Sequence, residues 1–255
     1  KKNASFLMFE TEYPNLLDDI EPEKIGVSSK LRRTSRPLYR KMVEKNELSW
    51  CIAAYPSKVW ADSLFDAEDS YDQFMNFIYK VCMVDKEDPI KSWDNHLEKV
   101  NKVITKLNSL NIDSMHYTNS LGTNLTVYLP ENYLFSSAKD SKVIVNMPSY
   151  EVFTSPIYTK TEGIVYSSMP LNYNGGIIDK FYLEFKNGKV INYKAEVGED
   201  LLKEVINSDS NTCYLGEAAL VEKTSPIASL NMVTGTTLID ENASCHLALG
   251  AGFRE

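Results

Sequence analysis

The chain has 255 residues, of which 43% are hydrophobic and 24% charged, so it can bury a core and has an ordinary globular composition. Its formal net charge of -8 argues against a general nucleic-acid binder, because phosphate binding needs clustered Lys and Arg. The spacing of the one basic cluster predicts the solvated face of a helix; its members are Lys30, Arg32, Arg33, Arg36, Arg40 and Lys41.

The sequence carries few signals of where the protein is located and of whether it is a whole polypeptide. No run approaches the roughly 18 apolar residues of a membrane span and no secretory signal is visible, so we expect a cytoplasmic protein without membrane or nucleic-acid partners. The triplets at Asn3, Asn124 and Asn242 fit the glycosylation pattern, which is frequent by chance, and the Asn242 copy lies in the phrase that carries His246. The ends of the sequence predict an internal fragment of a longer chain. Scattered cysteines without a CxxC pair predict reduced thiols; they are Cys51, Cys82, Cys213 and Cys245.

The first part of the chain predicts a strand, a helix and a second strand. The apolar run 5–10 predicts a buried strand, and a helix is expected from about 21 to 45 with an interruption near Pro37. Residues 50–55 predict the second buried strand. Because a strand–helix–strand unit pairs its strands in parallel, we expect a parallel sheet.

Two further helices are expected before residue 110. Apolar spacing predicts one over 69–84. Ser92 is a good N-cap for the next, whose apolar stripe extends to Leu107. His96 falls in this helix, where a capped or surface histidine is expected rather than a metal ligand.

From about residue 111 the sequence predicts mainly β-structure. Asn187-Gly188 predicts a tight hairpin turn, and a helix is expected over 199–207. The predicted fold class is therefore α/β: the remainder of an N-terminal α/β domain with a parallel sheet (1–110), followed by a β-rich α+β domain (111–255). The expected strands of the second domain are 114–118, 124–129, 141–145, 164–168, 176–186 and 189–196.

Three phrases of the second domain place ionisable side chains in stretches too apolar for a solvated surface. Glu151 lies in NMPSYEVFTSP, Glu217 in YLGEAAL and His246 in ENASCHLALG. Carboxylate and imidazole are the ligands that a divalent metal takes in a hydrolytic site. The three residues are therefore candidate metal ligands.

Each candidate also has a structural alternative. Glu151 could be an incidental acid in a surface turn, Glu217 a member of a structural ion pair, and His246 a satisfied core histidine. Asp240 and Glu241 could act as outer acids around a metal, or could simply cap the following turn.

At these residues the sequence resembles the thermophilic aminopeptidase family of metallopeptidases, of the aminopeptidase T, AmpS and PepS type. The resemblance is carried by NMPxxEVFTSP, LGExALV and LxDENASCHLALG, with steps of 66 residues from Glu151 to Glu217 and 29 residues on to His246. The phrases PEKI, LSWCIAAYP and GTNLTVYLP extend it upstream, so that it covers essentially the whole chain.

This resemblance implies a metallo-aminopeptidase that hydrolyses the N-terminal peptide bond of peptides with a free amine. It implies two divalent ions per site (Zn, Co, Mn or Mg) that activate a bridging water and polarise the scissile carbonyl. Glu151, Glu217 and His246 would be ligands, with Glu217 the bridge and the two glutamates the catalytic carboxylates. The second domain would then be the metal-binding catalytic domain, and the protein a homodimer.

Three departures from the family pattern bear on activity. Phe253 stands where the family commonly has a tyrosine seven residues after the histidine, and phenylalanine can neither ligate nor donate a hydrogen bond. The downstream His-x-Asp pair is absent, and the segment 230–238 differs from the usual one. We expect little or no activity if the sequence is a whole polypeptide, and a working enzyme if it is part of a longer one.

Two alternatives belong to other classes of protein. Glu151 and Glu217 could be the acid/base pair of a glycoside hydrolase, which metal independence and activity on sugars would identify. A catalytically inert relative could instead keep the fold as a binding or dimerisation module, an alternative that Phe253 and the missing His-x-Asp pair favour.

Overall fold

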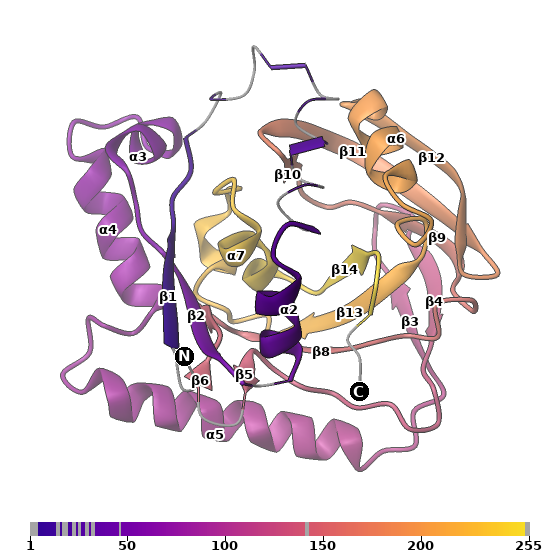
Figure 1. The fold of residues 1–255 in the computed structure, drawn as a ribbon, viewed down its shortest axis with the longest axis horizontal. Coiled ribbons are helices and arrows are strands. Elements are labelled where there is room, and N and C mark those ends of the chain that lie inside the picture. The colour runs from indigo at the N-terminus through magenta and orange to yellow at the C-terminus, as the bar shows by residue number, and fades with distance from the viewer. Residues whose placement is uncertain are drawn as a thin grey trace.

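The computed structural model describes residues 5–13, 16, 20, 21, 24, 27, 28, 31, 34–45, 47–140 and 143–252. Figure 1 shows helices α3 and α4 on one side of this part of the chain, a long helix α5 along its base, and most β-strands on the other side. No helix among these residues combines the length and apolar character that crossing a membrane requires. The four cysteines are free, as predicted.

The predicted parallel sheet is present. Strand β1 (Ser5–Glu10) pairs in parallel with β2 (Ser49–Ala54), and β2 pairs in parallel with the short β7 (Asn146–Met147). The third strand therefore comes from the half of the chain that was expected to be β-rich. Because β1 and β2 are parallel, both strands end at the same edge of the sheet.

The predicted interruption of the first helix at Pro37 is confirmed. Helix α2 (Pro37–Glu44) begins with the proline, and Arg36 before it has a non-helical backbone. Proline suits the first turn of a helix because no partner for its missing N–H is needed there. In the rest of the predicted helix, the described residues Lys24, Val27, Ser28, Leu31 and Thr34 are helical. Half of the basic cluster lies outside the described residues, namely Lys30, Arg32 and Arg33.

Two helices follow in the sequence, one before and one after residue 65. Helix α3 (Lys58–Leu64) was not predicted, although Ser57 is a good N-cap and accepts a hydrogen bond from Trp60 N at 3.1 Å. Helix α4 (Ser70–Val81) confirms the helix expected over 69–84.

Helix α5 (Pro89–Asn108) starts earlier than predicted. Asp88 is its N-cap and accepts a hydrogen bond from Lys91 N at 2.9 Å, and Pro89 occupies the first turn. The prediction of Ser92 as N-cap is wrong because Asp88-Pro89 already supplies a cap and a preset backbone one turn before it.

The largest sheet is antiparallel, with strand order β10-β11-β9-β4-β3 and with β12 paired to β11. Asn187 and Gly188 both have positive φ, of 50° and 77°, which confirms the predicted hairpin turn between β11 and β12. Helix α6 (Glu199–Asn207), also as predicted, packs Leu202 and Ile206 into the core of this sheet. The strands are β3 (Ser114–Thr118), β4 (Asn124–Tyr128), β9 (Glu162–Tyr166), β10 (Leu171–Tyr173), β11 (Gly176–Lys186) and β12 (Lys189–Val197).

A smaller antiparallel sheet has the order β14-β13-β8. Its strands are β8 (Glu151–Thr154), β13 (Leu215–Val221) and β14 (His246–Leu249). Of the strand expected over 141–145, the structure describes β6 (Val143–Ile144), which pairs with β5 (Lys139–Asp140). Between β13 and β14 lie three short turns of helix: η1 (Ala228–Leu230), α7 (Thr237–Asp240) and η2 (Glu241–Ala243).

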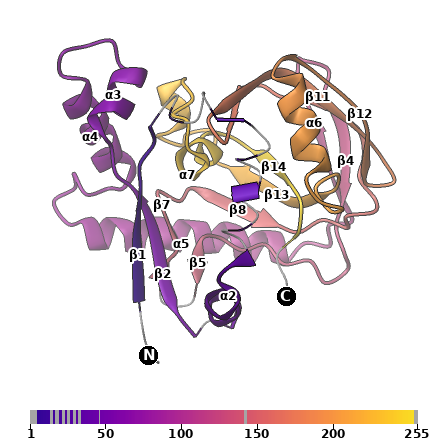
Figure 2. The same cartoon turned by 45° about the horizontal axis from the view of Figure 1, so that its top comes forward.

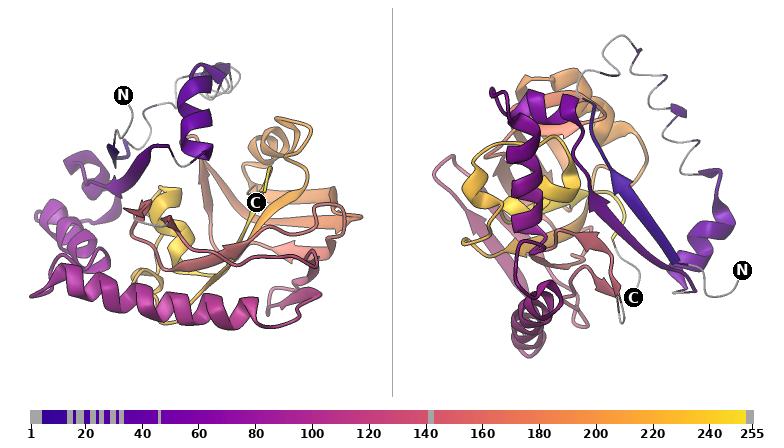
Figure 3. Two further views of the ribbon diagram at one scale, coloured as in Figure 1. Left: turned by 60° about the horizontal axis from the view of Figure 1, so that its bottom comes forward. Right: turned by 90° about the vertical axis from the view of Figure 1, so that its left-hand side faces the viewer.

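Apolar clusters pack against the smaller sheet and against the segments that lead into it. Helix α5 packs Ile104 and Leu107 against a cluster that includes Phe135 and Val152, and Figure 3 (left) shows this helix running beneath the strands. A second cluster joins Trp60 to Ile239, and Trp60 Nε1 donates a hydrogen bond to Thr234 O at 2.6 Å. This cluster contains residues from both sides of position 110, and the predicted domain boundary there stays a prediction.

Candidate metal centre

The three candidate ligands lie on the three strands of the smaller sheet. Glu151 is the first residue of β8, Glu217 lies within β13, and His246 is the first residue of β14. Figure 2 shows these strands between the parallel sheet and the large antiparallel sheet.

The strand register places the three side chains on one face. Glu151 pairs with Val221, and His246 pairs with Ala219. Side chains alternate along a strand, so Glu217, Ala219 and Val221 point to the same side of β13, together with their cross-strand partners. Ala219, which is fully buried, therefore lies between the ligand-bearing positions, where its small side chain leaves space for them.

A β-bulge at Gly216 sets the direction of Glu217. Leu215 pairs with Leu249 and Glu217 with the adjacent Ala248, so Gly216 is an extra residue on β13. Leu215 and Ala218 both belong to the core of the large sheet, although they are three positions apart. The bulge reverses the alternation between them. Without it, a core-facing Leu215 would turn Glu217 into the same core.

We expect Gly216→Ala to weaken metal binding and to lower stability. An added Cβ would lie 2.5 Å from Ala251 O and 2.7 Å from Gly250 O, so backbone must move, at a cost of about 1–3 kcal/mol. The measurements are zinc affinity by titration calorimetry and the free energy of unfolding. Gly176→Ala is the matched control, because the atom nearest to its added Cβ is the tip of the Leu201 side chain. Unchanged zinc affinity in Gly216→Ala would contradict this role of the bulge.

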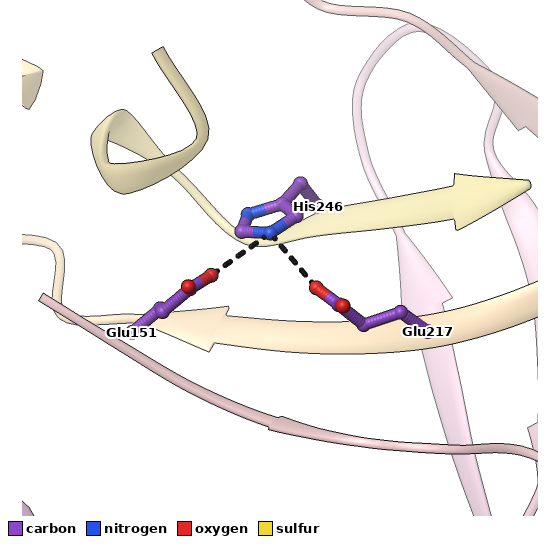
Figure 4. A group of neighbouring side chains, drawn as sticks. All are labelled: Glu151, Glu217 and His246. Atoms are coloured by element: carbon purple, nitrogen blue, oxygen red, sulfur yellow. Dashed lines mark ion pairs between the residues drawn. The ribbon is translucent and has the colours of Figure 1, made fainter. Parts of the chain in front are cut away.

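The ligand atoms converge. His246 Nε2 lies 3.1 Å from Glu151 Oε2 and 3.3 Å from Glu217 Oε1, as Figure 4 shows. One ligand atom from each residue lies within 4.8 Å of the other two. Glu151 is 4% exposed, and the other two side chains are largely buried. The surface-turn alternative for Glu151 is therefore wrong.

The negative charges of the Glu151 and Glu217 carboxylates favour a cation in this site. Burial by itself lowers the pKa of the His246 imidazole, but its contacts with the Glu151 and Glu217 carboxylates outweigh burial and raise it to about 10. His246 Nδ1 also contacts Ser244 O at 3.1 Å. Two carboxylates in a largely buried place thus require a cation, which a proton on His246 or a metal ion can supply.

The residues present fit a divalent metal ion. Glu151 Oε2 and His246 Nε2 are buried and, among the described residues, have no partner in hydrogen-bond geometry, although they lie 3.1 Å apart. Ligand atoms about 2.1 Å from a tetrahedral ion lie roughly 3.4 Å from one another, close to the two spacings here. Two carboxylates and an imidazole are also a donor set for Zn and related metals.

The two acids before His246 have different surroundings. The Asp240 carboxylate accepts hydrogen bonds from Thr234 N at 2.8 Å, Thr234 Oγ1 at 2.8 Å and Gly235 N at 3.0 Å, so it holds the turn before α7 rather than capping the turn that follows it. The pKa of Glu241 is raised to about 8, first by burial and then by the negative charge of the Glu151 carboxylate, one of the candidate ligands. The role of Glu241 as an outer acid stays a prediction.

His96, Phe253 and Asn242 are not among the three candidate ligands. His96 is half-buried rather than on the surface: its ring packs against Trp93 and Tyr150, and Nε2 lies 2.9 Å from Ser149 O. Phe253 lies outside the described residues. Asn242, noted in the sequence as a glycosylation triplet inside the phrase that carries His246, is 0% exposed. Its one local signal is its place between two acids and His246.

A buried carboxylate–imidazole centre on a mixed α/β fold is typical of metal-dependent hydrolases. The chain belongs to the thermophilic metalloprotease family M29, whose family model matches residues 1–255.

The relatives in this family are aminopeptidases. The chain is 34% identical over 261 residues to aminopeptidase AmpS of Bacillus subtilis (strain 168) and 34% identical over 262 residues to aminopeptidase PepS of Streptococcus thermophilus. Each alignment covers 99% of this chain and 63% of the relative, so the chain spans less than two thirds of their length. The structure of wild-type AmpT from Thermus thermophilus superimposes with a TM-score of 0.88 at 28% identity, covering 99% of this chain and 64% of AmpT.

Proposed function

We propose that the protein is a metal-dependent aminopeptidase that hydrolyses the N-terminal peptide bond of peptides. One observation carries the proposal: in a chain of family M29, two glutamates and a histidine bring ligand atoms within 4.8 Å of one another in a largely buried place. A bound divalent metal supplies a water that is nucleophilic at neutral pH and a Lewis acid for the scissile carbonyl.

The chain's own residues would hold and orient the reacting groups. Glu151, Glu217 and His246 would bind divalent metal (Zn, Co, Mn or Mg), and two ions per site are proposed by resemblance to the family. Glu217 lies on the central strand, between the strands of Glu151 and His246, and its role as the bridging ligand is proposed by resemblance to the family. Because all three ligands start from paired strands, their spacing is fixed before substrate arrives.

The remaining expectations are part of the same proposal. Peptides with a free N-terminus are the proposed substrates, and a homodimer in the cytoplasm is the proposed state. Residues 111–255 are proposed to form the metal-binding domain. Membership of a peptidase family leaves the glycoside-hydrolase alternative without support, whereas a catalytically inert binding module is the alternative that activity must decide.

The test uses the intact protein, stripped of metal and resupplied with Zn or Co. Amino-acid release is followed from a short peptide with a free N-terminus and from its N-acetylated twin. We expect metal-dependent release from the free peptide alone. Release from the acetylated twin would contradict exopeptidase action at a free amine. No release with any metal, from protein shown to be folded, would favour the inert binding module.

A further inference from the structure

The two outer strands of the site are not hydrogen-bonded to each other. In the order β14-β13-β8, Glu151 on β8 and His246 on β14 are separated by the central strand. Their spacing therefore depends on β13 and on any link between the segments that lead into the outer strands. A buried asparagine supplies such a link.

Asn242 uses both ends of its amide to join these segments. Its Oδ1 accepts a hydrogen bond at 2.6 Å from the backbone N–H of Tyr150, the residue directly before Glu151. Its Nδ2 donates to Leu238 O at 3.1 Å, within the helical turns before β14. The residue is 0% exposed, so bulk water does not compete for either bond in the folded protein.

The backbone of Asn242 is fixed as well. Its carbonyl oxygen accepts a hydrogen bond from Ser225 Oγ at 2.6 Å, and Ser225 is itself buried. Asn242 lies in η2, four residues before His246. The short chain between them transmits the position of Asn242 to the imidazole.

Other elements hold the Glu151 side of this link. The Tyr150 hydroxyl donates to Val81 O at 2.7 Å, and His96 Nε2 lies 2.9 Å from Ser149 O. Helices α4 and α5 thus fix the segment that enters β8. Loss of the Asn242 amide would leave this segment in place and would remove the direct link between it and the segment that carries His246.

We propose that Asn242 is a positioning residue of the metal centre, which sets the separation between the Glu151 carboxylate and the His246 imidazole. The inference rests on the proposed metal centre. Partners in the shell outside metal ligands typically change metal affinity by about 10–100-fold when they are removed. A merely structural asparagine would change stability without changing the affinity of the folded protein.

Asn108 provides a matched control. Its Nδ2 donates to Phe135 O at 3.0 Å and its Oδ1 accepts from Phe135 N at 2.7 Å, so it too joins two segments through both ends of its amide. Phe135 packs against Val152, which points to the face of β8 opposite Glu151.

The experiment compares Asn242→Ala, Ser225→Ala and Asn108→Ala in the intact protein. Thermal unfolding of each metal-free protein is recorded first. Cobalt affinity and the visible absorption spectrum of the bound cobalt are then measured well below the lowest unfolding midpoint, so that every variant is folded. We expect all three midpoints to fall, cobalt affinity to fall about 10-fold or more in Asn242→Ala, and the spectrum to change in that variant. Ser225→Ala should show a smaller loss of affinity, and Asn108→Ala none.

The outcomes separate this inference from the proposed function. Cobalt binding to Asn242→Ala with the affinity and spectrum of the unaltered protein would overturn the positioning role. If Asn242→Ala does not fold, Ser225→Ala decides, and unaltered affinity and spectrum there would overturn it. Failure of the unaltered protein to bind cobalt or zinc would instead refute the proposed metal centre itself.

Discussion

Glu217→Gln is expected to lower kcat/KM of the metal-loaded intact protein by at least about 100-fold, at or beyond the upper end of what partners outside the ligand shell contribute. The amide keeps the size of the carboxylate and loses its charge, so the fold should persist. Glu217 lies on the central strand, 3.3 Å from His246 Nε2, where the loss of a ligand affects both neighbours. The measurements are the initial rate of amino-acid release and the bound metal per chain.

Glu184→Gln is the matched control for this variant. Glu184 also lies on an antiparallel strand, β11, and accepts a hydrogen bond from Asn192 Nδ2 at 3.3 Å, but it is not among the three clustered ligands. It should keep both the rate and the metal content of the unaltered protein. Full activity in Glu217→Gln would exclude Glu217 from the reaction and from the metal site.

Zinc is expected to raise the thermal unfolding midpoint of the metal-free protein. A ligand at 100 times its Kd stabilises the folded state by about 2.7 kcal/mol, which corresponds to roughly 5–10 °C for a chain of this size. The unfolded chain cannot hold three ligands from residues 151, 217 and 246 at these spacings, so the gain belongs to the folded state. The measurement is a thermal scan at increasing zinc concentration.

Two controls define the origin of this stabilisation. Calcium should give little shift, because it prefers six to eight oxygen ligands and this site offers an imidazole. Glu151→Gln should remove most of the zinc effect, because it replaces a buried carboxylate whose Oε2 has no hydrogen-bond partner among the described residues. An equal zinc shift in Glu151→Gln would place the metal elsewhere.

Features with strong local signals are predictable from this sequence. Asn187-Gly188 is confirmed as a hairpin turn because both residues tolerate positive φ, and Pro37 is confirmed as a break because it favours the start of a helix. Ser92 fails as an N-cap because Asp88-Pro89 competes with it one turn earlier. Local capping rules identify both Ser92 and Asp88 as N-cap candidates, but they do not decide which of the two caps the helix.

Features that depend on distant partners are not predictable in this way. The Asn242 triplet reads the same on a surface and in a core, and its burial depends on Tyr150, 92 residues earlier in the chain. The direction of Glu217 depends on the bulge at Gly216, which exists only through pairing with β14. The spacing of Glu151, Glu217 and His246 in sequence cannot show that they meet; their apolar surroundings and the family motifs single them out.

The pairing of β14 with β13 makes the proposed metal centre a check on correct folding. A slip of β14 by one residue would turn His246 to the opposite face of the sheet and bring Leu247 to the ligand face. A misregistered chain would then lack its nitrogen ligand. Metal present during folding would bind the correctly registered chains and withdraw them from the mixture by mass action, so that it would select one alignment of the sheet over its neighbours.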